Sequence, residues 1–455
     1  MLRLFRRLAV AGFVAAVVFM NSTNSSAQDK SAAAEAAAKP DAGNWAAAPL
    51  AVANNKFAVD LLRQFGGKPT ENAFFSPFSI STALGMTWAG ARGGTADQMA
   101  SVLHLSDLPA DKVTASFHAL QQSLEETQKQ TGAQLVVANS LWPELQPEHP
   151  FLPAYIKQVQ TDFASEVTPM DYKHSTDAAR QTINKWVEDK THDKIKDLLQ
   201  MGDVDPSTRL VLVNAIYFKA SWDDPFEPRL NINDQFHLAD GSAKPVVLMR
   251  ATRFVKYLQA ELDSSSVQVL ALQYKRDANQ RGSGGIGDKP HSLSFIAILP
   301  KDAGGLTAVE KGLTADKLTD WLSSMKQERV QMFLPKFKME ERYPLGEGLA
   351  AMGIRDAFID PVTHASDPNR ADFSGMNGTR DLYISKAIHQ TFLDLDENGT
   401  EAAAATAITM RVGAAMQSPQ IVFRADHPFL FMIRDDATGA ILFMGRLADP
   451  PKPAS

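Results

Sequence analysis

Residues 397–407 read ENGTEAAAATA, and this run decides how the whole chain is interpreted. Helix propensity alone predicts a helix here, because four alanines follow a glutamate. The continuation to Val412 predicts a strand instead. From Thr400 onwards, alternate residues are small and then apolar, whereas the interleaved set carries both charges, Glu401 and Arg411. That two-faced pattern is typical of a strand with one buried side.

The same stretch has unusually small side chains, which gives it a weak preference for a permanent strand. Small side chains would let the segment enter a sheet between existing strands without displacing core volume. Two interpretations follow from the pattern. The segment either changes from an exposed loop to a central strand, or it is an exposed Ala-rich linker between strand-rich blocks. The pattern alone leaves both open.

The chain around this run mixes helical and strand patterns. Apolar residues recur with helical spacing in residues 54–64, 79–89, 96–103, 112–130, 152–163 and 176–199. Short runs rich in β-branched or large apolar residues predict strands over residues 134–141, 210–218, 246–249, 294–299, 331–337, 421–423, 429–433 and 441–444. Helices therefore dominate the first third and strands the rest, which predicts an α+β domain with large sheets.

Composition narrows the functional classes. The 455 residues carry a net charge of −6, which argues against nucleic acid and against an anionic membrane surface as partners. The chain has no cysteine, so disulfides, thiolate catalysis and Cys–zinc sites are excluded. No metal-binding His pattern, phosphate-binding Gly loop or Gly-x-Ser-x-Gly elbow occurs, so we expect no metal and no cofactor. A hydrolase triad built from residues far apart in the sequence remains an alternative.

The N-terminus has the features of an export signal. Arg3, Arg6 and Arg7 precede an apolar run from Leu8 to Met20, and small residues follow up to Ala27. The apolar run is shorter than the roughly 20 residues of a membrane-spanning helix. We therefore expect residues 1–27 to be a signal peptide, residues 28–50 an Ala-rich linker, and residues 51–455 the folded domain. The mature protein would be secreted or periplasmic.

Residues 397–406 resemble the hinge of the reactive-centre loop of inhibitory serpins, a family of serine protease inhibitors. Other motifs resemble the same family and occur in its order along the chain. They are NAFFSPFSI (72–80), GARGGT (90–95), INKWV (183–187), VNAIYFK (213–219), LPKF (334–337), DHPFLF (426–431) and LFMGR (442–446). The likeness extends from about residue 54 to residue 450.

The resemblance implies a single serpin domain with three β-sheets, eight to nine helices and an exposed reactive-centre loop at about residues 397–420. It implies a suicide-substrate inhibitor rather than an enzyme. A target protease attacks a bond in the loop and forms an acyl-enzyme, and the freed loop then inserts as a new central strand of the main sheet. That insertion traps the protease before deacylation. Together with the export signal, the resemblance implies an exported bacterial member of the family. We expect the protein to be a monomer.

The family pattern also assigns roles to individual residues. Asn398 departs from it, because an acid is usual there. The hinge would comprise Glu397, Gly399, Thr400, Glu401, Ala402, Ala403, Ala404, Ala405 and Thr406, with Thr400 the first side chain to enter the sheet. Ser76, Ser79, Asn214 and His389 match the cluster that controls sheet opening, and Trp222 matches a tryptophan at the top of the sheet, where insertion begins.

The cleaved bond follows from spacing in the family. Counting forward from Gly399 places Gly413 before the cut bond, and counting back from Phe423 places Ala414 there. Neither selects Arg411, so elastase- or subtilisin-like proteases are favoured over trypsin-like ones. The competing function is a non-inhibitory serpin that binds or carries a ligand. Such members tend to have charged or bulky residues where this chain has Thr400 and its alanines.

Overall fold

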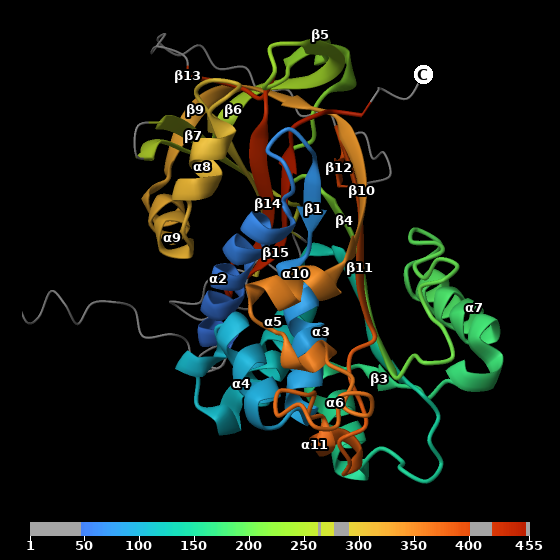
Figure 1. Ribbon diagram of the computed structural model, residues 1–455. Helices are drawn as coiled ribbons and strands as arrows, with labels where there is room; N and C mark the ends of the chain where they lie inside the picture. Colours follow the sequence, from blue (N-terminus) through green and yellow to red (C-terminus); the bar gives the residue numbers. More distant parts are fainter. Residues whose placement is uncertain (1–46, 263–264, 277–290, 401–420, 452–455) are drawn as a thin grey trace, which may run out of the picture. The chain divides into compact units, whose positions relative to one another are not determined.

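Strand β4 (Leu210–Ser221) is the central element of the fold, because its two faces are buried in different cores. Its even-numbered apolar residues, such as Leu212 and Ile216, belong to the main core, whereas Val211 and Val213 pack in a smaller core with helix α7 (Tyr172–Lys190). A strand buried on both sides has no polar face, which explains the nearly unbroken apolar run that predicted it. Figure 1 shows β4 beside β11, with α7 on one side and α3 on the other.

The computed structural model describes residues 47–262, 265–276, 291–400 and 421–451. All of them belong to one compact unit, residues 42–455. The expected signal peptide, most of the expected linker and residues 401–420 of the reactive-centre loop lie outside the described residues.

The sheet around β4 has six strands. Their order is β10 (Phe337–Pro344), β11 (Lys386–Asp396), β12 (Gly399–Thr400), β4, β2 (Gln134–Pro143) and β3 (Glu166–Val167). Strand β11 also pairs directly with β4, in parallel, over residues 386–392. The two-residue strand β12 therefore lies between β11 and β4 only at one end of the sheet.

The second sheet has nine strands. Their order is β1 (Ala73–Phe75), β15 (Ile441–Leu447), β14 (Phe429–Asp435), β8 (Leu293–Pro300), β7 (Ser265–Gln273), β6 (Ala243–Leu262), β9 (Lys326–Pro335) and β13 (Ile421–Arg424), with β5 (Ile232–His237) also paired to β6. One half of β6 pairs with β5 and the other with β7. The described residues thus form two hydrogen-bonded sheets, because this 20-residue strand runs through both β5 and β7 ladders.

Ten α-helices lie in the described residues. They are α2 (Ala47–Phe65), α3 (Pro77–Gly90), α4 (Gly93–Val102), α5 (Val113–Thr131), α6 (Pro153–Phe163), α7, α8 (Leu306–Gly312), α9 (Ala315–Ser324), α10 (Leu345–Met352) and the four-residue α11 (Ser374–Asn377). The predicted α+β class is confirmed, although six of these helices, α6 to α11, follow the first third of the chain.

Three local predictions were wrong. Residues 331–337 are two strands, because the chain leaves β9 at Pro335 and enters β10, in the other sheet, at Phe337. The helix expected over residues 176–199 ends at Lys190, and Asp193 and Asp197 then adopt positive φ angles that a helix does not allow. Strand β11 was not predicted at all, because three polar residues at 389–391 interrupt its apolar pattern.

Candidate functional site

The start of the reactive-centre segment is already part of the six-stranded sheet. Gly399 and Thr400 pair antiparallel with Asp396 and Leu395 of β11, and on the other side with Ser221 and Ala220 of β4. Below this point β11 and β4 pair with each other. The two strands have therefore separated at one end only, and β12 fills the separation. We call this position, defined by residues 399–400 between β11 and β4, the upstream seat.

Gly399 is required at the seat by its surroundings. Its φ angle is 150°, and a Cβ atom added to it would lie 2.1 Å from the carbonyl oxygen of Ala220. Backbone contact this close leaves no room for any side chain, and glycine is the residue that tolerates both constraints. The resemblance implied a flexible glycine, and the structure adds that close approach to β4 demands it.

The side chain of Thr400 is fully buried and hydrogen-bonded. Its Oγ1 lies 2.7 Å from the hydroxyl oxygen of Tyr274, and both residues are at most 1% exposed. The ring of Tyr274 stacks on Trp222, with ring centroids 4.6 Å apart. Trp222 donates from Nε1 to the carbonyl of Asp396 and from its backbone amide to the carbonyl of Asn398. Two aromatic rings thus form the wall against which the seat packs.

Glu397 is bound by two residues that lie between other elements, Lys336 between β9 and β10 and Asn231 just before β5. One carboxylate oxygen lies 3.0 Å from Nζ of Lys336, and the other accepts a hydrogen bond from Asn231 at 2.6 Å. Burial alone would raise the pKa of Glu397, but hydrogen bonds from its own backbone amide, Lys336 and Asn231 outweigh burial and lower the pKa. Glu397 is therefore charged at neutral pH and fixes the approach of the chain to the seat.

A second polar group lies further down the same strands. Asn139 of β2, Asn214 of β4 and His389 of β11 are directly paired along the sheet, so they form one row across three strands. Ser76, the N-cap of α3, and Ser79 in its first turn lie against this row. Asn214 donates to Oγ of Ser79 at 2.6 Å, and all five residues are at most 4% exposed.

The hydrogen bonds of His389 define its protonation. The amide of Ser76 donates to Nε2 at 3.0 Å, so Nε2 carries no proton, and Nδ1 donates to Oδ1 of Asn214. Burial lowers the pKa of His389 to about 3. Oγ of Ser76 donates to the carbonyl of Leu442 rather than to the imidazole. Ser76 and His389 therefore form a structural hydrogen-bond network and do not form a nucleophile–base pair.

Comparisons with known proteins agree with this arrangement. The family model described as "Serpin (serine protease inhibitor)" matches residues 52–450. The chain belongs to the serpin family. It is 37% identical over 413 residues to the leukocyte elastase inhibitor of Homo sapiens, covering 88% of this chain and 99% of that protein. It is 36% identical to Serpin B10 of Otolemur garnettii, covering 88% of this chain and 100% of that one.

Solved serpin structures are similar over the same region. Uncleaved ovalbumin matches with a TM-score of 0.72 and 30% identity, covering 88% of this chain and all of that one. Human thyroxine-binding globulin, solved with its hormone, matches with a TM-score of 0.73 and 29% identity, covering 90% of this chain and all of that one. The family is one of protease inhibitors that act as suicide substrates.

The structure divides the expected serpin residues into two groups. Asn214 and His389 belong to the row described above, and Ser76 and Ser79 lie against that row. Trp222 instead lies at the upstream seat with Glu397, Gly399 and Thr400. Residues 401–406 of the hinge and the bait candidates Gly413 and Ala414 lie outside the described residues. Sequence reasoning missed Asn139 and Tyr274. A single asparagine inside an apolar strand was the available signal for Asn139, but Tyr274 gave none.

The downstream end of the segment is held in a different way. Strand β13 has four residues and pairs with one partner, β9, in parallel. Its last residue, Arg424, forms ion pairs with Asp234 and Asp426 and stacks over the ring of Phe333, 4.5 Å from the ring centroid. A parallel pair at a sheet edge is the weaker kind of pairing. Phe423, which is fully buried in the main core, and the charged contacts of Arg424 add to what holds β13 in place.

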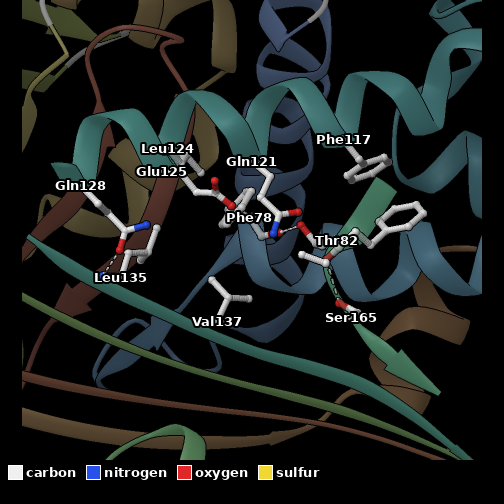
Figure 2. Close-up of a pocket in the computed structure, with 12 residues that line it drawn as sticks. Phe78, Thr82, Phe117, Gln121, Leu124, Glu125, Gln128, Leu135, Val137 and Ser165 are labelled. Carbon is white, nitrogen blue, oxygen red and sulfur yellow. Dashed lines mark hydrogen bonds between the residues drawn. The ribbon is translucent and has the colours of Figure 1, made fainter. Parts of the chain in front are cut away.

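A cavity of about 170 Å³ lies apart from this segment, between α5 and β2. Figure 2 shows Phe78, Leu135 and Val137 lining its interior, with Gln121 and Gln128 on the helix above. Gln128 accepts a hydrogen bond from the amide of Leu135, so its carbonyl is already occupied. Within the described ranges, no cluster of three His, Cys, Asp or Glu side chains is suited to a metal, and no helix has the length and apolarity to cross a membrane.

Proposed function

We propose that this serpin inhibits serine proteases by offering residues 397–420 as bait and inserting the cleaved segment between β4 and β11. The observation that carries the proposal is the upstream seat. Gly399 and Thr400 already pair with both neighbouring strands in an uncut chain, so insertion would extend an existing pairing rather than nucleate a new one. Extension avoids much of the entropic cost of starting a strand.

The register of the seat supports the proposal. Thr400 pairs with Leu395 and Ala220. If the same register continued, Ala402 and Ala404 would share the inward face of Thr400, because side chains alternate along a strand. Thr406 would then come level with His389 and Asn214, which now pair with each other. A hydroxyl at that position would replace the hydrogen bond that insertion breaks, and the small alanines would fit between the two strands.

The bait bond is proposed to be Gly413–Ala414 or Ala414–Ala415. Small residues at the cut bond fit the shallow specificity pockets of elastase- or subtilisin-like proteases. Five of the similar proteins are named as leukocyte elastase inhibitors, which is consistent with such a target. On this proposal the chain is a substrate that traps its protease as an acyl-enzyme, and it needs no catalytic residue of its own.

Carriage of a small ligand is the second candidate, because thyroxine-binding globulin shares the fold at a TM-score of 0.73. The seat argues for inhibition instead. Thr400 and the alanines at 402–405 are small enough to be buried in the sheet, whereas non-inhibitory members tend to have charged or bulky residues at these positions.

Export is proposed from residues 1–27 alone. Cleavage after Ala27 would leave Gln28 as the first residue of the mature protein. Expression of the full chain in a bacterial host, followed by N-terminal sequencing of the protein in the periplasm and medium, tests this. An intact N-terminus in the cytoplasmic fraction would contradict it.

The decisive experiment mixes the protein with elastase-, subtilisin- and trypsin-like proteases. We expect a denaturant-resistant complex with at least one elastase- or subtilisin-like protease, and sequencing of the released C-terminal peptide would locate the cut bond. Cleaved protein should also melt far above the intact form, because the inserted strand adds backbone hydrogen bonds worth about 0.5–1.5 kcal/mol each. Cleavage by every protease without any complex would overturn the proposal.

A further inference from the structure

The nine-stranded sheet carries a strongly exposed aromatic side chain, Phe254, near the downstream end of the reactive-centre segment. Phe254 of β6 is 70% exposed, and Val422 of β13 is 43% exposed. Phe254 is paired with Arg329, and Val422 is paired with Gln331, on the shared neighbour β9. Paired residues point to the same side of a sheet, so Phe254 and Val422 lie on one face, two strands or about 10 Å apart.

Basic residues surround these two side chains. Arg250 and Lys256 are exposed and lie an even number of residues from Phe254 along β6, so they share its face of the sheet. Arg329 is exposed and is paired with Phe254 on β9. Within the described part of the chain, no ion pair joins any of these three cations to an acid. A concentration of unpaired positive charge is notable on a protein whose net charge is −6. We name the set Arg250, Phe254, Lys256, Arg329 and Val422 the β6–β9–β13 face.

This face is continuous with the reactive-centre segment. Val422 is the second residue of β13, and β13 begins directly after residue 420. Figure 1 shows β13, β9 and β6 grouped together near β5. A protease that reaches a bait bond eight or nine residues before Val422 has to stand close to the strand that receives the end of the loop.

We propose that the β6–β9–β13 face is a second contact surface for the target protease, recognising an acidic surface with an apolar patch beside its catalytic cleft. The inference rests on the proposed inhibitory function and deepens it by giving the partner a chemistry. Exposed aromatic and arginine side chains are the residues that contribute most at protein interfaces. Basic groups around them raise the rate of encounter with an acidic partner.

The test compares association rates for variants of the face with matched controls. Phe254→Ser removes the apolar contact and Arg329→Glu reverses one charge. Met201→Ser and Lys173→Glu make comparable changes at exposed positions, the first in the connection between α7 and β4 and the second on α7. We expect Phe254→Ser and Arg329→Glu to slow association with the inhibited protease about tenfold, with the controls within about twofold of the unmodified protein.

Two further readouts separate docking from trapping. The stoichiometry of inhibition and the denaturant resistance of the complex should stay unchanged in the Phe254→Ser variant, because the seat is untouched. Added salt should slow association of the unmodified protein more than that of Arg329→Glu, since screening acts on exposed charges. Equal rates for face variants and controls, with inhibition intact, would overturn the docking surface and leave the proposed function standing.

Docking can also be measured without trapping. A photo-cross-linking phenylalanine analogue at position 254 is mixed with a protease whose nucleophilic serine is replaced by alanine, and the same analogue at position 201 serves as the control. Cross-linking to the protease from position 254 alone supports the proposal even if no covalent complex ever forms. Cross-linking to a second copy of the serpin, to nothing, or equally from both positions would refute it.

Discussion

The two ends of the reactive-centre segment are held by different kinds of contact. The upstream end, Gly399–Thr400, is buried between two strands through backbone hydrogen bonds and one neutral side-chain pair. The downstream end, Ile421–Arg424, is an edge strand with one partner, held by the buried side chain of Phe423 and by partly exposed ion pairs of Arg424. A cut between them would leave the first end with a two-sided position to extend into and the second end where it is. On the proposed mechanism, this difference between the two ends explains why the upstream part of the cut segment would insert and the downstream part would stay in place.

The largest effect is expected from Thr400→Arg at the upstream end. The site is fully buried beside Tyr274, and an unpaired charge cannot be accommodated there without large cost. The segment should leave the seat, so that the protease cuts the loop and escapes. We expect the number of inhibitor molecules consumed per protease to rise about tenfold or more. Thr182→Arg on the exposed face of α7 is the control. Unchanged stoichiometry for Thr400→Arg would break the comparison.

Acid should weaken the pairing beneath the seat. The unfolded chain takes up a proton on His389 near its ordinary pKa of 6.5, whereas the folded chain does not until about pH 3. The free energy of unfolding should therefore fall by about 1.4 kcal/mol for each pH unit between these values. His389→Gln keeps a donor and an acceptor but does not titrate. Denaturant unfolding at pH 7, 6 and 5 should show the stability advantage of the unmodified protein shrinking, and a constant difference would contradict the prediction.

Arg424→Met tests the downstream end. Methionine keeps an unbranched apolar chain over Phe333 but loses the ion pairs with Asp234 and Asp426. Because these groups are partly exposed, we expect a loss of about 1–2 kcal/mol in the free energy of unfolding. Inhibitory activity should also decay faster at 37 °C without any cleavage, since a released β13 would let an uncut segment move inwards. Activity that decays at the unmodified rate would show that backbone pairing and the buried Phe423 hold β13 without the ion pairs of Arg424.

The smallest effect compares two tyrosine hydroxyls, one near each end. Tyr274→Phe leaves the buried hydroxyl of Thr400 without its partner, which should cost about 1 kcal/mol of unfolding free energy. Tyr257→Phe removes a partner of Gln268, whose amide also donates to the carbonyl of Val422. The side chain of Gln268 is only partly buried, so water can replace the lost partner, and we expect a smaller loss of unfolding free energy than for Tyr274→Phe. Thermal or urea unfolding of the pair measures both, and a larger effect at Tyr257 would reverse the comparison.

The sequence by itself determined the family and the α+β class, and it predicted which residues take part in insertion. Alternation from Thr400 to Val412 predicted a latent strand. Ser76, Ser79, Asn214 and His389 were grouped by their match to the family pattern, although they lie up to 313 residues apart. These features are readable because they depend on local pattern and on residue types that a position requires.

Only the tertiary structure decided which residues meet. It placed Tyr274 against Thr400 across 126 residues of sequence, added Asn139 to the row of His389, and gave Trp222 its partners at the seat. It also set the register that brings Gly399 against Ala220 and separated the two ends of the segment into a buried neutral position and a charged edge. Strand pairing joins residues without regard to their distance in the chain, so no local pattern encodes it.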